Sequence, residues 1–149
     1  MASSSTVVEL REATIYQQDF QILQEVNLTI ARGEFVYLIG KTGEGKSSLL
    51  KTLYGDLPLT EGGGQVAGFD LPGLNRKTIP QLRRKLGIVF QDFNLLSDRT
   101  IYDNLEFVLG ATGWKSKPEI QERIQKVLAD VQLPDIQQKK PHELSGGER

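Results

Sequence analysis

The sequence has no cysteine and no excess of charge of either sign. Without cysteine the chain can form neither disulfides nor thiolate metal sites, so a reducing, cytoplasmic setting is expected. The 18 Lys+Arg residues nearly balance the 19 Asp+Glu residues, which leaves a formal net charge of −1. A nucleic-acid-binding protein usually carries a strong basic excess, so this balance argues against nucleic acid as a partner.

A long hydrophobic run is also missing. The longest apolar segment, residues 35–39, is far shorter than the ~20 residues that a membrane-spanning helix needs. Residues 1–6 contain neither a basic start nor an apolar stretch, so no secretory signal is expected. With 38% hydrophobic and 25% charged residues, the composition is typical of a soluble globular domain.

The pattern of apolar and polar residues predicts an α/β protein whose later part is helical. Helices are predicted at residues 46–53, near 80–85, and over 101–109 and 120–131. A run of three glycines at residues 62–64 indicates a flexible break. Short strands are predicted at residues 7–10, 13–16 and 26–30, and strands buried within a sheet at residues 35–39 and 86–90.

A phosphate-binding loop is predicted between the buried strand at 35–39 and the helix at 46–53. Its glycines let the backbone approach a phosphate closely, its N–H groups form an anion nest, and the helix adds its positive end. A chance match on a glycine-rich turn is the alternative, but the flanking strand and helix favour phosphate binding. The pattern G-x-x-x-x-G-K-[ST] is matched by Gly40, Lys41, Thr42, Gly43, Glu44, Gly45, Lys46 and Ser47.

Two of these residues carry specific expected roles. The ammonium of Lys46 is expected to reach the β- and γ-phosphates, and the hydroxyl of Ser47 is expected to ligate Mg²⁺. Ser48 follows directly and is included among the nucleotide-binding candidates. The predicted cofactors are therefore ATP and Mg²⁺.

A GTPase is one class of protein with such a loop. Residues 70–73 match the D-x-x-G pattern of GTPases, but the sequence has no N-K-x-D motif to read guanine. A turn rich in turn-forming residues is the favoured interpretation of residues 70–73.

Three further features resemble the nucleotide-binding subunits of ABC ATPases. Residues 144–148 read Leu-Ser-Gly-Gly-Glu, which matches the ABC signature, Gln91 stands at the end of a predicted strand, and Tyr16 precedes the phosphate loop. The resemblance implies that Tyr16 stacks on adenine and that Lys46 and Gln91 are catalytic residues. It implies as well that Gln91 contacts Mg²⁺. It also implies a head-to-tail homodimer, in which Ser145, Gly146 and Gly147 bind the γ-phosphate of the partner's ATP.

Within that family, several segments resemble the FtsE-like cell-division subgroup: residues 79–92, 94–96 and 98–105. This implies a polytopic, FtsX-like membrane partner contacted by residues 93–105, and a peripheral position on the inner face of the cell membrane. Lipoprotein-release and macrolide-type ATPases share much of these segments, so a transporter subunit is the alternative function.

The resemblance finally implies an incomplete ATP-binding domain over residues 1–149. Residues 1–91 would form part of the β/α ATP-binding core, that is the N-terminal β subdomain and RecA-like core, and residues 92–149 the helical signature subdomain. In this family the signature helix is followed by the Walker B strand, which ends in Asp-Glu, and by a switch histidine. Because phosphoryl transfer needs a positioned water, we expect residues 1–149 alone to bind nucleotide but to hydrolyse ATP negligibly. A non-hydrolysing nucleotide-binding module is therefore a third interpretation.

Overall fold

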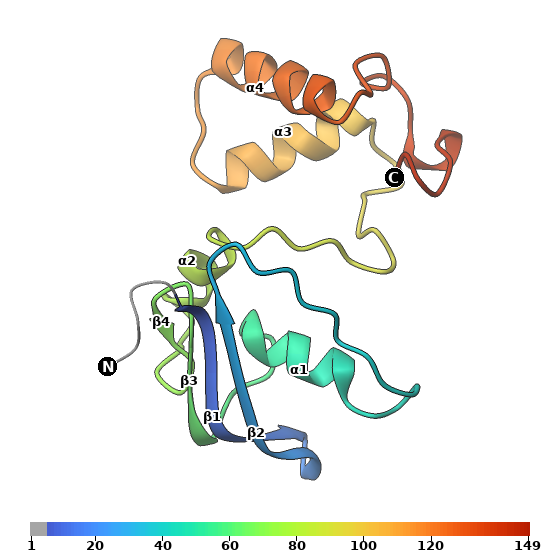
Figure 1. Ribbon diagram of the computed structural model, residues 1–149. Coiled ribbons are helices and arrows are strands. Elements are labelled where there is room, and N and C mark those ends of the chain that lie inside the picture. The colour runs from blue at the N-terminus through green and yellow to red at the C-terminus, as the bar shows by residue number, and fades with distance from the viewer. Residues whose placement is uncertain (1–5) are drawn as a thin grey trace. The chain divides into compact units, whose positions relative to one another are not determined.

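A long β-hairpin opens the part of the chain that the computed structural model describes, residues 6–149 (Figure 1). Residues 1–5, which include most of the segment used above to judge a secretory signal, lie outside the described residues. The chain divides into two compact units, one ending at residue 87 and the other formed by residues 88–149. Each unit is described by itself.

The first unit is built on a four-stranded antiparallel sheet with the order β2-β1-β3-β4. The two short strands predicted at 7–10 and 13–16 belong to one continuous strand, β1. Between Leu10 and Ala13 the pairing of β1 with β2 shifts its register, but the strand does not end. The predicted strand at 26–30 lies within β2. The strands are β1 (Thr6–Gln17), β2 (Phe20–Ala31), β3 (Glu61–Val66) and β4 (Phe69–Asp70).

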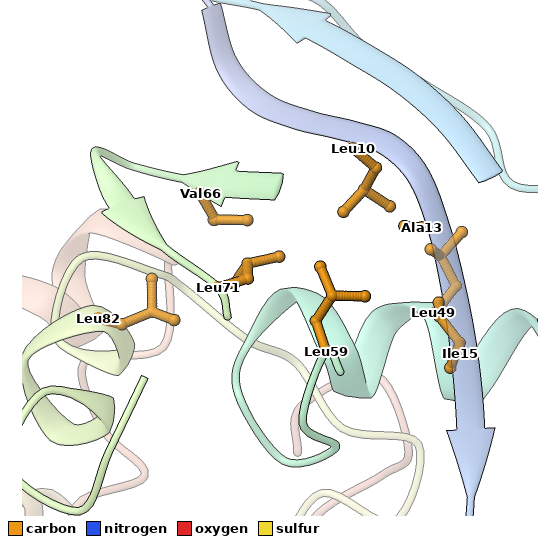
Figure 2. Packing of buried hydrophobic residues seen from close by; sticks show 8 residues of the cluster. All are labelled: Leu10, Ala13, Ile15, Leu49, Leu59, Val66, Leu71 and Leu82. Carbon is orange, nitrogen blue, oxygen red and sulfur yellow. The ribbon is translucent and has the colours of Figure 1, made fainter. Parts of the chain in front are cut away.

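Helix α1 (Lys46–Leu53) packs against β1 and has the bounds that the sequence predicts. A short helix, α2 (Ile79–Arg83), follows near the predicted position. Figure 2 shows side chains from β1, β3, α1, α2 and the intervening loops meeting in one core. The buried members of this core are Leu10, Ala13, Ile15, Leu49, Leu59, Val66, Leu71 and Leu82.

The glycines at 62–64 do not form the flexible break that the sequence predicts, because they belong to strand β3. A Cβ on Gly64 would lie 2.7 Å from Leu10 Cδ2 and 2.9 Å from Glu9 O. The glycines therefore allow β3 to approach β1 more closely than a residue with a side chain could.

The predicted buried strands at residues 35–39 and 86–90 are wrong: neither segment forms a strand among residues 6–149, and most of their side chains are exposed. The exposed fraction reaches 86% for Ile39 and 96% for Val89. A strand buried on both faces requires neighbouring strands at its edges and a packed layer on each face. The apolar sequence supplies the composition of such a strand but not these neighbours, and β1–β4 include neither segment.

The second unit is helical, as predicted, and contains α3 (Ile101–Ala111), α4 (Lys117–Asp130) and the 3₁₀ turn η1 (Pro141–Glu143). The buried sides of α3 and α4 contribute to a second hydrophobic core. Val108 and Val131, which the apolar spacing places on those faces, are 56% and 61% exposed. The buried residues of this core are Ile101, Ile120, Ile124, Leu128, Ile136 and Leu144.

A capping box begins α3. The Thr100 hydroxyl accepts a hydrogen bond from the Asp103 backbone N–H at 3.1 Å, and the Asp103 carboxylate accepts from Thr100 N and Oγ1 at 3.2 and 2.7 Å. The hydrogen bond from the Thr100 side chain is the main reason why the pKa of Asp103 is lowered. Ile101 N donates to Lys139 O at 2.8 Å, which ties the start of α3 to the segment before the signature.

Asn104 fixes the loop before α3 from a buried position. Its Oδ1 accepts from Leu96 N at 2.7 Å, and its Nδ2 donates to Leu96 O at 3.1 Å and to Thr100 O at 2.8 Å. One side chain thus satisfies three backbone groups, which explains physically why an asparagine follows the residues of the capping box.

Replacing Asn104 by leucine is expected to destabilise the second unit by about 2–3 kcal/mol, because an apolar side chain of similar size removes the hydrogen bonds to Leu96 N and Leu96 O, while Thr100 O keeps the bond from the backbone N–H of residue 104. Urea unfolding followed by circular dichroism measures the loss. Gln137→Leu is the matched control, since its side chain makes one exposed hydrogen bond, to Pro134 O at 3.3 Å. Equal stability of the two variants would contradict the structural role of Asn104.

Among residues 6–149, no helix is both long enough and apolar enough to cross a membrane.

Candidate nucleotide-binding site

The predicted phosphate loop leads into α1 through glycines in left-handed conformation. Gly43 has φ 88° and Gly45 has φ 86°. Gly45 caps α1, and its carbonyl accepts the first helical hydrogen bond, from Leu49 N at 2.9 Å. No side chain caps this helix end, so the first N–H groups of α1 remain available to an anion.

Gly45 is required by packing as well as by its backbone angle. A Cβ at this position would lie 2.8 Å from Ile22 Cγ2 and 3.0 Å from Leu23 Cδ2, both on β2. The close contact seats the start of α1 directly against the hairpin of the first unit.

Lys46 lies half-buried in the first turn of α1 and folds back over the loop. Its Nζ donates to Gly40 O at 2.7 Å and to Lys41 O at 2.6 Å. The structure thus places the ammonium above the loop, where the sequence predicts its contact with phosphate. Ser47 is exposed beside it, and its hydroxyl is an oxygen donor of the kind that Mg²⁺ takes together with substrate phosphates.

Glu44 is the one acidic residue of the loop. Its Oε2 accepts a hydrogen bond from Lys41 N at 2.6 Å and lies 2.6 Å from the point that a Cβ on Gly40 would occupy. In the G-x-x-x-x-G-K-[ST] pattern Glu44 supplies only a backbone N–H group, and nothing in the residue pattern indicates where its carboxylate lies.

Tyr16 lies near the end of β1. This strand forms a hairpin with β2, which carries the side chains of Ile22 and Leu23 that lie close to Gly45. Tyr16 pairs with Gln21, while its neighbour Ile15 pairs with Leu23, which packs against Gly45. The structure therefore brings the predicted adenine-binding aromatic and the phosphate loop to one end of the hairpin. The order of the motifs along the sequence does not reveal this proximity.

The hydroxyl of Tyr16 donates to the Glu61 carboxylate at 3.0 Å. This hydrogen bond is the main reason why the pKa of Tyr16 is raised, with desolvation and the charge of Glu61 adding to it. Glu61 is a functional candidate that the sequence analysis misses, because its link to Tyr16 depends on the pairing of β3 with β1.

The remaining candidates, Gln91 and residues 145–147, belong to the second unit. Gln91 is exposed in a turn, at the end of a segment that forms no strand. Residues 146–148 form a turn rather than the helix start that the signature predicts. The predictions that these residues bind nucleotide and Mg²⁺ stay predictions.

Within the signature, Glu148 binds back to Ser145. Its Oε2 accepts from Ser145 N at 2.8 Å and from Ser145 Oγ at 2.6 Å, and the bond to the hydroxyl is the main reason why the pKa of Glu148 is lowered. Glu148 N also donates to Ser145 O at 3.2 Å. The Glu148 side chain thus makes the carboxylate half of a capping box, whereas Glu148 N bonds the carbonyl of Ser145 and not its hydroxyl.

Among residues 6–149, no group of three or more His, Cys, Asp or Glu side chains could hold a metal ion.

A model of the family described as "ABC transporter" matches residues 23–149 of this chain. The chain belongs to the ABC transporter family. The match includes the phosphate loop, Gln91 and the signature, and it confirms the resemblance on which the sequence interpretation rests.

The curated relatives that match include ATP-binding proteins of two kinds. The cell division ATP-binding protein FtsE of Streptococcus pneumoniae serotype 2 (strain D39) is 35% identical over 145 residues, which cover 97% of this chain and 63% of the relative. The methionine import ATP-binding protein MetN of Clostridioides difficile (strain 630) is 34% identical over 143 residues, which cover 96% of this chain and 44% of the relative. The chain thus spans less than two thirds of the length of these relatives.

Solved structures confirm the predicted ABC nucleotide-binding fold class. The ATP-binding cassette MJ0796, a dimer in a post-hydrolysis state bound to ADP and Pi, matches with a TM-score of 0.80 and 32% identity. The match covers 95% of this chain and 64% of that one. CbiO1 of Clostridium perfringens, part of an ABC transporter complex, matches with a TM-score of 0.83 and 30% identity, over 97% of this chain and 58% of that one.

Proposed function

We propose that this chain binds Mg-ATP as part of an ABC ATPase that couples nucleotide binding and hydrolysis to a membrane partner. The observation that carries the proposal is the uncapped start of α1, with Lys46 Nζ held above the loop by Gly40 O and Lys41 O. Donors arranged in this way suit the oxygens of a polyphosphate. Membership of the ABC transporter family supports the choice of ATP.

The proposed roles follow the chemistry of each group. The ammonium of Lys46 neutralises the β- and γ-phosphates, the hydroxyl of Ser47 holds Mg²⁺, and the ring of Tyr16 stacks on adenine. In the whole protein, Gln91 contacts Mg²⁺ and the attacking water. The signature residues serve the γ-phosphate of a second copy, so the active form is a homodimer with shared ATP, and the dimeric MJ0796 cassette supports this arrangement.

The membrane partner is proposed to be an FtsX-like polytopic protein in bacterial cell division, which places the ATPase on the cytoplasmic face of the membrane. The FtsE relatives support this function. A transporter subunit is the second candidate, because MetN and CbiO1 match nearly the whole of this chain as well. In either case the residues proposed to contact the partner are 93–105.

Tyr16 offers a test of the nucleotide assignment that leaves the phosphate loop unchanged. Tyr16→Ala is expected to weaken Mg-ATP binding about 10-fold, because base–aromatic stacking contributes about 1–3 kcal/mol. Tyr16→Phe keeps the ring and loses only the hydrogen bond to Glu61, so its affinity should stay near that of the unaltered chain. Calorimetric titration with Mg-ATP measures both variants, and equal affinity of Tyr16→Ala and Tyr16→Phe would contradict stacking.

A further inference from the structure

The phosphate loop contains an anion of its own. Glu44 folds back so that Oε2 accepts from Lys41 N at 2.6 Å, while Glu44 N donates to Lys41 O at 3.3 Å. These two contacts close the loop on itself within four residues. A carboxylate oxygen therefore takes a backbone N–H group of the very loop whose N–H groups are proposed to bind phosphate.

The Glu44 carboxylate and the stem of Lys46 both lie near Gly40. The point that a Cβ on Gly40 would occupy is 2.6 Å from Glu44 Oε2 and 3.8 Å from Lys46 Cδ. The ammonium of Lys46 meanwhile donates to Gly40 O and Lys41 O. Two of the donors that a phosphate would recruit, Lys41 N and Lys46 Nζ, thus have acceptors within the chain already.

We infer that the Glu44 carboxylate is a resident anion of the phosphate loop, which a nucleotide phosphate must displace in order to bind. The inference rests on the proposed function, and it assigns to Glu44 the effect of lowering the affinity of the loop for nucleotide. Displacement removes the hydrogen bond to Lys41 N. It also leaves a negative carboxylate close to negative phosphates, which weakens binding further.

The effect of Glu44 on binding depends on whether the ligand carries phosphate. Adenosine carries no phosphate and does not compete with the carboxylate, so Glu44 does not alter its binding. ADP and ATP both enter the loop, and Glu44 weakens the binding of both.

The test compares Glu44→Gln and Glu44→Ser with the unaltered chain in calorimetric titrations with Mg-ATP and Mg-ADP. Glutamine keeps the size and an acceptor oxygen but removes the charge, whereas serine removes both the charge and the reach. Binding is expected to become about threefold tighter in Glu44→Gln and about tenfold tighter in Glu44→Ser, as expected for loss of a charged hydrogen bond and a like-charge contact.

Glu34→Gln is the matched control. The Glu34 carboxylate accepts from Ala31 N at 2.6 Å, which is the same type of contact over the same spacing in an exposed turn outside the phosphate loop. The affinity of Glu34→Gln for nucleotide should equal that of the unaltered chain. Thermal unfolding by circular dichroism verifies that all variants are folded.

The outcomes separate the inference from the proposed function. If the unaltered chain binds Mg-ATP through Lys46, and both Glu44 variants bind it equally or more weakly, the inference is overturned while the proposed function stands. Equal tightening in Glu34→Gln would also overturn it, because the effect would then be one of overall charge. If neither the unaltered chain nor the Glu44 variants bind nucleotide, the proposed function fails and the inference fails with it.

Discussion

Replacing Lys46 by alanine is expected to weaken Mg-ATP binding at least about 100-fold. The ammonium is held above the loop by Gly40 O and Lys41 O, at 2.7 and 2.6 Å, and is ready to turn toward phosphate. Each hydrogen bond to a charged group contributes about 1.5–3 kcal/mol, so two bonds from the ammonium to phosphate oxygens account for a loss of this size. Alanine favours the helical conformation, so α1 should keep its first turn.

Lys51→Ala is the matched control for this prediction. Lys51 lies on the same helix but in its last turn, where Nζ is 4.0 Å from the Asp56 carboxylate. An exposed ion pair of this kind contributes little, so neither stability nor nucleotide affinity should change measurably. Calorimetric titration with Mg-ATP measures both variants. An affinity of Lys46→Ala within threefold of that of Lys51→Ala would refute the assignment of the phosphate loop.

The glycine-rich loop and α1 could be predicted from sequence because the residues that form them are close together in the chain. Glycine spacing, one lysine and the leucines that follow determine a loop and a helix within 14 residues, 40–53, and the structure has that helix at Lys46–Leu53. The cap of α3 is local in the same way, since Thr100 and Asp103 are three residues apart. Such features require no information about distant parts of the chain.

The sequence was less informative wherever a distant segment decides the structure. Residues 35–39 have the composition of a buried strand, but composition does not provide the strands that would flank them. The link between Tyr16 and Glu61 requires β3 to pair with β1, and no local pattern announces that pairing. The position of the Glu44 carboxylate likewise depends on how the loop closes. The motif includes Glu44, but it does not indicate the hydrogen bond to Lys41 N.

The glycines of β3 are the clearest case of distant structure overriding a local pattern. Gly62 has φ 81° and lies opposite the register shift between Arg11 and Thr14 of β1. A Cβ on Gly62 would collide with Glu12 O and would lie 2.7 Å from Ala13 Cα. These are backbone atoms, and Ala13 is fully buried, so no flexible side chain can move aside.

Gly62→Ala is therefore expected to destabilise the first unit by about 2–5 kcal/mol, combining about 1–2 kcal/mol for a left-handed alanine with about 1–3 kcal/mol for displacing packed backbone. Two glycines separate these causes. Gly68 has φ 83° with open space around it, so Gly68→Ala should cost about 1 kcal/mol from the backbone angle alone. Gly63 has no such angle, and its Cβ would meet only the Arg11 side chain at 3.7 Å, so Gly63→Ala should change stability by less than about 0.5 kcal/mol. Urea unfolding followed by circular dichroism gives the three values. A loss in Gly62→Ala no larger than that in Gly68→Ala would mean that β1 and β3 are not in this close contact.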